Sequence, residues 1–269
     1  MNILSIDVGM KHLAYCVIKT NSKEEYEILD WSIINLCTDK VNPKCMTNTS
    51  KKICNKESKY YKNNNYYCKL HAKKTEFLIP TPNLKANNLK KMKMHELKTI
   101  SLNRKYEMIK NSKKQDYINK IADDLSNNYL NFVEKIDSRQ VDIVTFGKRI
   151  KTCFDEIVKK YNINCLLIEN QIGPLALRMK MLQGMIIQHF IEIDCETIRE
   201  ISPSNKLKPY IKENKKTTYL ERKKMSIDVT RNILKEKKPL LKWIEYFDKH
   251  KKKDDLADSF LQALWYIKQ

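Results

Sequence analysis

The chain has 269 residues, of which 52 are Lys or Arg and 32 are Asp or Glu, so its formal net charge is +20 at pH 7. This excess favours a polyanionic partner, most often nucleic acid, although AT-rich coding also produces abundant Lys, Asn and Ile. No apolar stretch approaches the roughly 18 residues of a membrane span, no secretory signal opens the chain, and four glycines are too few for several phosphate-cradling loops. A soluble intracellular protein is therefore expected.

The first expected strand spans residues 2–9, where apolar and β-branched residues surround Asp7. Gly9 then allows a sharp turn, because glycine adopts backbone angles that other residues avoid. Apolar runs at residues 13–18 and 26–36 predict two further strands. From this stretch alone, Asp7 is either the first metal ligand of a nuclease or an acid that merely caps the turn.

Eight cysteines occur without a secretory signal, so they are expected to be reduced, and clustered ones to bind metal rather than form disulfides. The polar segment 37–71 contains Cys45, Cys54, Cys68 and His71. The Cys68-x-x-His71 spacing suits one side of a tetrahedral Zn²⁺ site, and Cys45 with Cys54 would supply the other side. We predict a structural Zn²⁺ site with Cys37 as a spare candidate ligand. The alternative is a loop that holds unrelated reduced thiols.

Residues 72–140 are basic and mostly helical in character. Between residues 72 and 114 there are twelve Lys or Arg and three Glu. Apolar residues then recur at helical spacing, at Ile118, Ile121, Leu125, Tyr129, Leu130 and Val133. We interpret the segment as a helical arm that contacts DNA, while a solvated helical face explains any single lysine equally well.

Helices and strands alternate after residue 142. The expected order is an amphipathic helix over 143–161, a strand over 165–171, a long apolar helix over 175–193 and a strand over 196–201. The first of these strands is a continuous apolar run that ends in Glu169, as buried strands of parallel sheets do. The long helix is apolar on more than one side, so it is either buried in the core or packed in part against a second subunit.

Basic residues are again dense between Asn205 and Lys224, which hold eight Lys or Arg and two Glu. Near the entrance of a site such residues would hold phosphates without reading sequence. The Thr218-x-x-Glu221 pattern predicts a capping box that opens a helix running to about residue 234.

The last predicted helix carries acids beside its apolar stripe. Asp255 and Asp258 are three residues apart and share a helix face, so we interpret them as metal ligands. Asp254 is interpreted as an acid that only stabilises the helix N-terminus through its dipole.

If the strands of Asp7 and Glu169 are neighbours, four carboxylates meet at one sheet edge. Two Mg²⁺ ions about 3.5–4 Å apart, or Mn²⁺ as a substitute, would neutralise them and clamp a scissile phosphate.

Three short motifs carry a resemblance to a known family: Ser5-Ile-Asp7-Val-Gly9, Ile168-Glu169-Asn-Gln171 and Asp255-Leu-Ala-Asp258-Ser. Over residues 1–36 and 141–269 the chain resembles the RuvC-type Holliday junction resolvases of the ribonuclease H-like superfamily, and most closely the branch found in poxviruses and other large DNA viruses. The resemblance implies a homodimeric, Mg²⁺-dependent endonuclease that nicks four-way DNA junctions symmetrically during recombination and replication, at the viral replication site. It also implies that Asp7, Glu169, Asp255 and Asp258 are the catalytic, metal-binding residues.

The expected architecture is an α/β, ribonuclease H-like mixed sheet flanked by helices. This nuclease domain would consist of residues 1–36 and 141–269. Residues 37–140 would form a basic insertion, with the zinc site in residues 37–71 and the helical arm in residues 72–140. Compact members of the family lack such an insertion, so the way in which this chain grips junction arms stays open.

Three other classes of protein compete with this interpretation. A transposon-associated RuvC-like nuclease can carry a zinc module, but usually places it between the second and third acids rather than between the first and second. An actin-like ATPase also opens with Asp-x-Gly, but needs glycine-rich loops that are absent from this sequence. A non-catalytic, zinc-bearing DNA-binding protein explains the charge and the cysteines, but leaves the carboxylates as a coincidence.

Overall fold

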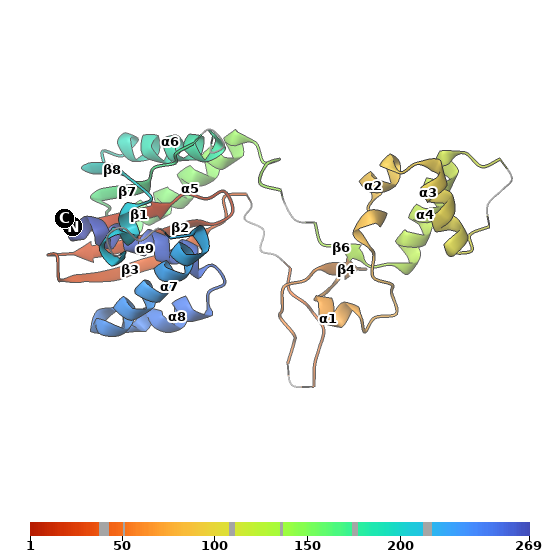
Figure 1. Ribbon diagram of the computed structural model, residues 1–269, viewed down its shortest axis with the longest axis horizontal. Coiled ribbons are helices and arrows are strands. Elements are labelled where there is room, and N and C mark those ends of the chain that lie inside the picture. The colour runs from red at the N-terminus through yellow and green to blue at the C-terminus, as the bar shows by residue number, and fades with distance from the viewer. Residues whose placement is uncertain (38–42, 51, 108–110, 135–136, 174–176, 212–216) are drawn as a thin grey trace. The chain divides into compact units, whose positions relative to one another are not determined.

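The computed structural model describes residues 1–37, 43–50, 52–107, 111–134, 137–173, 177–211 and 217–269 (Figure 1). The chain divides into two compact units. The sheet unit consists of Met1–Asp39 and Ile136–Gln269, and the inserted unit consists of Lys40–Lys135. Within the described residues, no helix is both long enough and apolar enough to cross a membrane.

A five-stranded mixed sheet forms the centre of the sheet unit. Its order is β3 (Tyr26–Ile34), β2 (Leu13–Thr20), β1 (Asn2–Asp7), β7 (Cys165–Glu169) and β8 (Thr197–Ile201). The first three strands are antiparallel, whereas β1, β7 and β8 are parallel. The mixed α/β sheet and its strand positions, including three strands at the N-terminus, confirm the predicted fold class.

Helices cover both faces of this sheet (Figure 1). One face packs against α5 (Ile143–Tyr161) and α6 (Leu177–Glu192), and the other against α7 (Tyr219–Glu236), α8 (Ile244–Lys249) and α9 (Lys253–Ile267). Because side chains alternate along a strand, Leu4 and Ile6 enter the first core, whereas Ile3 enters the second. Burial on both faces explains why the strands are nearly continuous apolar runs.

Local sequence signals set the ends of two of these helices. The carboxylate of Asp142 accepts a hydrogen bond from the backbone N–H of Thr145 at 2.8 Å, and this N-cap begins α5. Asn162 ends the same helix in the left-handed conformation with φ of 47°. The predicted capping box is present at α7, where Thr218 and Glu221 exchange side-chain and backbone hydrogen bonds.

The inserted unit combines a small sheet with short helices. Its elements are β4 (Tyr60–Lys62), β5 (Asn65–Tyr67), α1 (Lys69–Ala72), η1 (Pro82–Leu84), α2 (Ala86–Lys91), α3 (Met94–Asn103), α4 (Lys114–Asn128) and β6 (Asn131–Phe132). A separate apolar cluster of Leu84, Leu89, Leu97 and Ile121 holds the helices together. The expected continuation of helical periodicity to Val133 is wrong, because α4 ends at Asn128 and the chain then pairs with β4 as strand β6.

Candidate active site and metal centre

Two of the predicted acids lie side by side at the carboxyl ends of two neighbouring strands of the central sheet. The parallel register pairs Ile6 with Ile168, so Asp7 and Glu169 end neighbouring strands at the same level. Side chains alternate between the two faces of a strand, so Asp7 points to the same face as Ile3, and Glu169 to the same face as Leu167. Ile3 and Leu167 pack on the face covered by α9. The side chains of Asp7 and Glu169 therefore emerge toward α9.

Helix α9 is attached to this edge by buried polar contacts. The Nε2 group of Gln262 donates to Ser5 Oγ at 3.1 Å, to the Ile6 carbonyl at 3.2 Å and to the Leu167 carbonyl at 3.3 Å. On the far side, Trp31 Nε1 donates to the Leu256 carbonyl at 3.0 Å. These contacts fix the first turns of α9, which carry Asp255 and Asp258, over the carboxyl ends of β1 and β7.

Lys206 lies at the centre of this acidic edge. Its ammonium Nζ is 2.6 Å from Glu169 Oε2 and 2.7 Å from Asp258 Oδ2. The residue belongs to the short 3₁₀ helix η3 (Asn205–Tyr210), which the buried side chain of Leu207 anchors in the core. Although burial opposes its charged form, the carboxylates of Asp258 and Glu169 raise the pKa of Lys206. The ammonium thus bridges two of the predicted acids.

The electrostatics of Asp7 show how strongly negative the site remains. Burial and the neighbouring carboxylate of Glu169 raise the pKa of Asp7 well above its usual range, while Lys206 lowers it. The carboxylates of Asp258 and Asp255 raise it further. The other three acids therefore all act on Asp7, and the ammonium of Lys206 does not offset their effect and that of burial.

The two acids that begin α9 differ in their partners. Asp254 Oδ2 lies 2.5 Å from the ammonium of Lys223 on α7, outside the group around Lys206, which agrees with its interpretation as a structural acid. Asp255 Oδ2 lies 3.6 Å from Lys252. Burial and the adjacent carboxylate of Asp254 raise the pKa of Asp255. Asp255 is thus more loosely paired than Asp254.

Gly9 is required by the close approach of the chain that follows β1. A Cβ atom at this position would lie 2.4 Å from the carbonyl oxygen of His12. Contacts this short do not occur between real side chains and backbone, so any larger residue must displace the turn. The Asp7-x-Gly9 motif thus couples an acid at the strand end to a turn that only glycine fits.

The inserted unit contains the predicted metal-binding group. The ligand atoms of Cys45, Cys54, Cys68 and His71 all lie within 4.8 Å of one another. Cys54 Sγ and Cys68 Sγ are 3.9 Å apart, and Cys45 Sγ is 3.3 Å from His71 Nδ1. Tetrahedral Zn²⁺ with Zn–S bonds of about 2.3 Å places its sulfur ligands roughly 3.8 Å apart. The spacing therefore fits a tetrahedral Cys₃His metal site.

The thiol chemistry of this group also suits a metal. Burial opposes ionisation of Cys45, but hydrogen bonds from Thr47, from the backbone and from His71 lower its pKa to about 6. A thiolate is the form in which cysteine binds zinc. Cys37 does not join the group: it is buried in the core against α5 and α6, with its Sγ 3.4 Å from the Met10 carbonyl.

Lys206 was not among the predicted site residues. It is one of eight basic residues between Asn205 and Lys224, and nothing in the spacing separates it from the others. One signal was available: the apolar residues Leu207, Tyr210 and Ile211 gather in the first part of this stretch, so this turn was able to reach the core. Part of the basic stretch, residues 212–216, lies outside the described residues.

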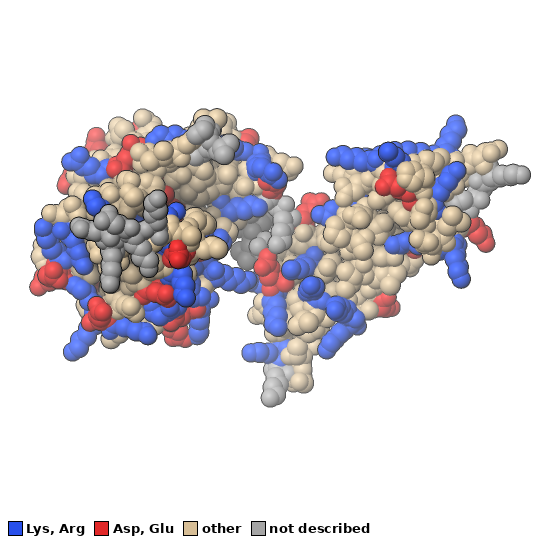
Figure 2. Space-filling view, viewed as in Figure 1, with Lys and Arg blue, Asp and Glu red and all other residues tan. Residues whose placement is uncertain are grey.

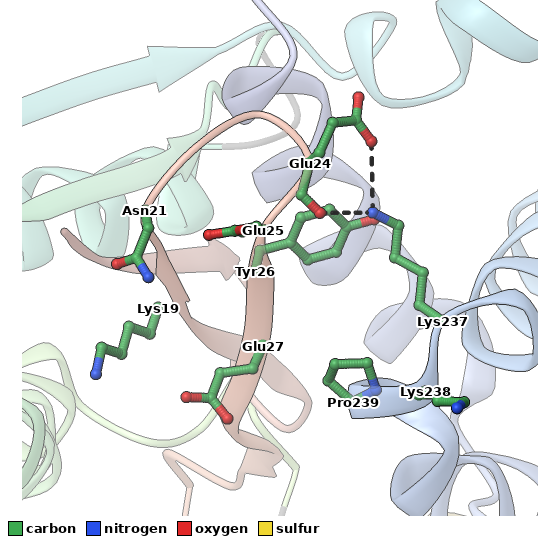
Figure 3. Close-up of a pocket in the computed structure, with 9 residues that line it drawn as sticks. All are labelled: Lys19, Asn21, Glu24, Glu25, Tyr26, Glu27, Lys237, Lys238 and Pro239. Carbon is green, nitrogen blue, oxygen red and sulfur yellow. Dashed lines mark hydrogen bonds and ion pairs between the residues drawn. The ribbon is translucent and has the colours of Figure 1, made fainter.

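A surface pocket lies at the opposite edge of the sheet (Figure 3). Lys19 and Tyr26, which line it, belong to the ends of β2 and β3 next to the start of β1. The ammonium of Lys237 lies 4.2 Å from the centroid of the Tyr26 ring and donates to the Glu24 carbonyl at 2.8 Å. Lys237 and Glu24 pair within this pocket, and it contains none of the predicted site residues.

The fold and the site together define a class of protein. A mixed sheet whose central parallel strands end in acids, with an acidic C-terminal helix packed on it, has the architecture expected of a ribonuclease H-like α/β domain, with a group of carboxylates at the carboxyl ends of β1 and β7. Residues 124–269, more than half of the chain, match the family described as Poxvirus A22 protein. The chain belongs to this family, which confirms the resemblance to the poxvirus branch.

Individual relatives are more distant. The uncharacterized protein L451 of Acanthamoeba polyphaga mimivirus is 28% identical over 322 residues, which cover 99% of this chain and 74% of the relative. Among solved structures, yeast mitochondrial Holliday junction resolvase Ydc2 matches with a TM-score of 0.44 and 14% identity, covering 99% of this chain and 78% of that one. Fowlpox virus resolvase with Holliday junction DNA matches with a TM-score of 0.41 and 14% identity, covering 99% and 97%.

Proposed function

We propose that this chain is a Holliday junction resolvase, a structure-selective endonuclease that nicks four-way DNA junctions during recombination and replication of viral DNA. Membership of the poxvirus A22 family supports this function. The observation that carries it is the meeting of Asp7, Glu169, Asp255 and Asp258 around the carboxyl ends of β1 and β7, with Lys206 between two of them.

The donor set of this site suits a hard divalent cation. Carboxylate oxygens are the ligands that Mg²⁺ and Mn²⁺ prefer. Burial, together with the carboxylates of Glu169, Asp258 and Asp255, raises the pKa of Asp7, and a nearby cation would lower it. Asp7, Glu169, Asp255 and Asp258 would hold the metal. When bound, the cation supplies activation of a water nucleophile and stabilisation of the leaving oxygen of a phosphodiester.

The side chains of the protein prepare the site for this chemistry. Lys206 forms ion pairs with both Glu169 and Asp258, which partly offsets their repulsion and keeps the two acids close together before substrate arrives. Its ammonium is also a positive charge beside the position where a phosphate would enter. Gln262 fixes α9 on the sheet and so holds the spacing between the acids of α9 and those of the strands.

The test is a cleavage assay with a labelled four-way DNA junction and, beside it, a linear duplex of the same sequence, each in Mg²⁺. Paired symmetric nicks in the junction alone are expected. Cleavage of the duplex at a similar rate would contradict this proposal and would indicate a nuclease of broader substrate range. Binding without cleavage in any divalent metal would favour the non-catalytic DNA-binding protein.

We also propose that the Cys₃His group binds one structural Zn²⁺. The spacing of its ligand atoms supports this assignment, and a small polar segment of this kind has little apolar core of its own. Zinc supplies folding free energy in such segments, on the order of 10 kcal/mol in isolated zinc-finger peptides. Its removal is therefore expected to affect the structure of the inserted unit more than the chemistry of the sheet unit.

For Cys68→Ser we expect a loss of bound zinc from about one ion per chain to much less than one, together with rapid proteolysis of residues 43–134. Elemental analysis and limited digestion with mass mapping measure both effects. Cys153→Ser, on α5 of the sheet unit, is the matched control and should keep the metal. Equal zinc content in Cys68→Ser and the wild type would contradict the assignment.

We further propose a homodimer that forms through one face of α6. Leu177, Met181 and Ile191 are 71%, 50% and 53% exposed. Their spacing of four and ten residues, with Gly184 between them, places them along one side of the helix. A Cβ atom at Gly184 would meet nothing within 4 Å, so this side of the helix is open for close packing.

Met181→Glu is expected to convert the dimer to a monomer, because it places a charge in the centre of an apolar interface. Sedimentation velocity gives the oligomeric state directly. Leu220→Glu on α7 is the matched control, since Leu220 is equally apolar and 77% exposed. A wild-type chain that is monomeric at tens of micromolar, or a dimer that survives Met181→Glu, would exclude this face.

A further inference from the structure

The net positive charge of the chain is concentrated in the inserted unit. Lys40–Lys135 contain 22 Lys and Arg against 8 Asp and Glu, a net charge of +14, whereas the sheet unit contains 30 against 24, a net charge of +6. A composition bias that acted on the whole chain would distribute the charge more evenly. The inserted unit is therefore the strongly cationic part of the protein.

Most of this charge lies on the surface. Sixteen of the described lysines in the inserted unit are exposed. Figure 2 shows Lys and Arg side chains spread over the part that holds α2, α3 and α4, with fewer Asp and Glu among them. A surface of this kind attracts a polyanion and repels another cationic protein.

Five lysines gather where the ends of three helices meet. We call this group the α2–α4 lysine cluster; it consists of Lys90, Lys91, Lys93, Lys113 and Lys114. The first two end α2, Lys93 and Lys113 precede α3 and α4, and Lys114 begins α4. The ammonium of Lys114 donates to the carbonyl of Lys90 at 3.0 Å, which brings the end of α2 next to the start of α4.

The two acids beside this cluster accept hydrogen bonds from backbone N–H groups. Glu96 Oε2 accepts from the backbone N–H of Lys93 at 2.6 Å, and Asp116 Oδ2 accepts from that of Lys113 at 2.6 Å. Each carboxylate thus caps the N-terminus of a helix instead of forming an ion pair with a lysine of the cluster. Five lysines against these two acids give this group a net charge of +3.

The cluster is held on a folded support. Leu89, Leu97 and Ile121 are buried between α2, α3 and α4. Lys62 of β4 is itself buried and donates to the Tyr129 carbonyl at 3.0 Å, so the end of α4 is tied to the small sheet of β4, β5 and β6. The charges are therefore presented in a defined arrangement rather than along a flexible tail.

We propose that the inserted unit is a second DNA-binding unit, and that its α2–α4 lysine cluster binds the phosphate backbone of a duplex arm. This inference rests on the proposed function for the identity of the polyanion as DNA. Lysine is a point charge on a flexible stem, so the cluster would contact phosphates without reading bases. It would add affinity for the arms of a junction without taking part in cleavage.

The test compares two triple variants of the full-length protein. Lys90→Gln, Lys91→Gln and Lys114→Gln together remove three charges from the cluster and keep good helix formers. The matched control is Lys19→Gln, Lys235→Gln and Lys238→Gln, which removes three exposed charges from the sheet unit; Lys19 and Lys238 line the pocket of Figure 3. Circular dichroism and thermal melting verify that both variants fold like the wild type.

The readout is the dependence of duplex and junction affinity on salt, measured by fluorescence anisotropy without divalent cations. Each lost phosphate contact lowers the slope of log K against log salt by about 0.9. The cluster variant should lose up to about 3 in slope, whereas the control should change by much less. Cleavage at saturating protein should stay within about threefold of the wild type, because the cluster lies outside the candidate active site.

Three outcomes would overturn the inference. The first is an unchanged slope in a folded cluster variant, and the second is an equal loss in the control. The third is a cluster variant that loses affinity for vesicles of phosphatidylserine but not for DNA, which would assign the surface to membranes. Failure of the proposed function is distinguishable, because the wild type would then bind DNA without cleaving junctions, whatever the behaviour of the variants.

Discussion

Asp7→Asn is expected to abolish junction cleavage, with a rate loss of at least about 10²- to 10³-fold. The amide has nearly the shape of the carboxylate but carries no charge, so it cannot act as an anionic metal ligand at the end of β1. Junction affinity measured without divalent cations should stay within about twofold of the wild type. Single-turnover cleavage and anisotropy on the same labelled junction measure the two quantities separately.

The control for this variant is on α9. Asp254→Asn also removes one carboxylate, but Asp254 pairs with Lys223 and not with Lys206, so cleavage should stay close to that of the wild type. Thermal melting in EDTA excludes unfolding as the cause of the loss. Asp7→Asn should melt at the same or a higher temperature, since it removes a buried carboxylate that Glu169 repels. Cleavage within tenfold of the wild type would exclude Asp7 from the chemistry.

Lys206→Met is expected to lower the free energy of unfolding in EDTA by about 3–5 kcal/mol. The side chain of Lys206 is only 11% exposed, and methionine fills its volume without its charge, so Glu169 and Asp258 are left facing Asp7 unpaired. Added Mg²⁺ should recover more stability in this variant than in the wild type, because a bound cation replaces the missing positive charge. Urea melts with and without Mg²⁺ measure this difference.

Lys223→Met is the matched control. Lys223 of α7 pairs with Asp254, which lies on α9 like Asp258, but the side chain of Lys223 is 35% exposed. Its loss should cost about 1 kcal/mol or less, with no extra response to Mg²⁺. Cleavage should fall in Lys206→Met and not in Lys223→Met. Equal costs in the two variants, or an equal Mg²⁺ response, would show that Lys206 does not serve as the internal counter-cation of the acid group.

Local sequence patterns predicted the fold of the sheet unit well. Apolar runs that end in Asp7 and Glu169 located β1 and β7, because strands buried on both faces leave an uninterrupted apolar signal. The capping box at Thr218 located the start of α7, since its hydrogen bonds join residues only three positions apart. Signals of this kind depend on neighbours in the chain and are therefore visible without a structure.

Predictions failed where the deciding contact is distant along the chain. The residues after Asn128 have helical periodicity, but pairing of β6 with β4, about seventy residues earlier, makes them a strand. Cys37 lies next to the cysteine-rich segment in sequence, yet it is buried in the core of the sheet unit near Met10. In both cases burial and long-range pairing outweighed local composition.

The sequence by itself determined the types of chemistry in this protein: acids at strand ends, a Cys₃His group, and a large excess of lysine. Only the tertiary structure decided which lysine joins the acids. Of the eight basic residues, Lys206 is the one that pairs with these acids within the described part of the chain, because Leu207 packs η3 into the core. The ammonium of Lys206 then lies next to Glu169 and Asp258. A charge has a defined role only where burial removes the water that would otherwise screen it, and burial is a property of the folded chain.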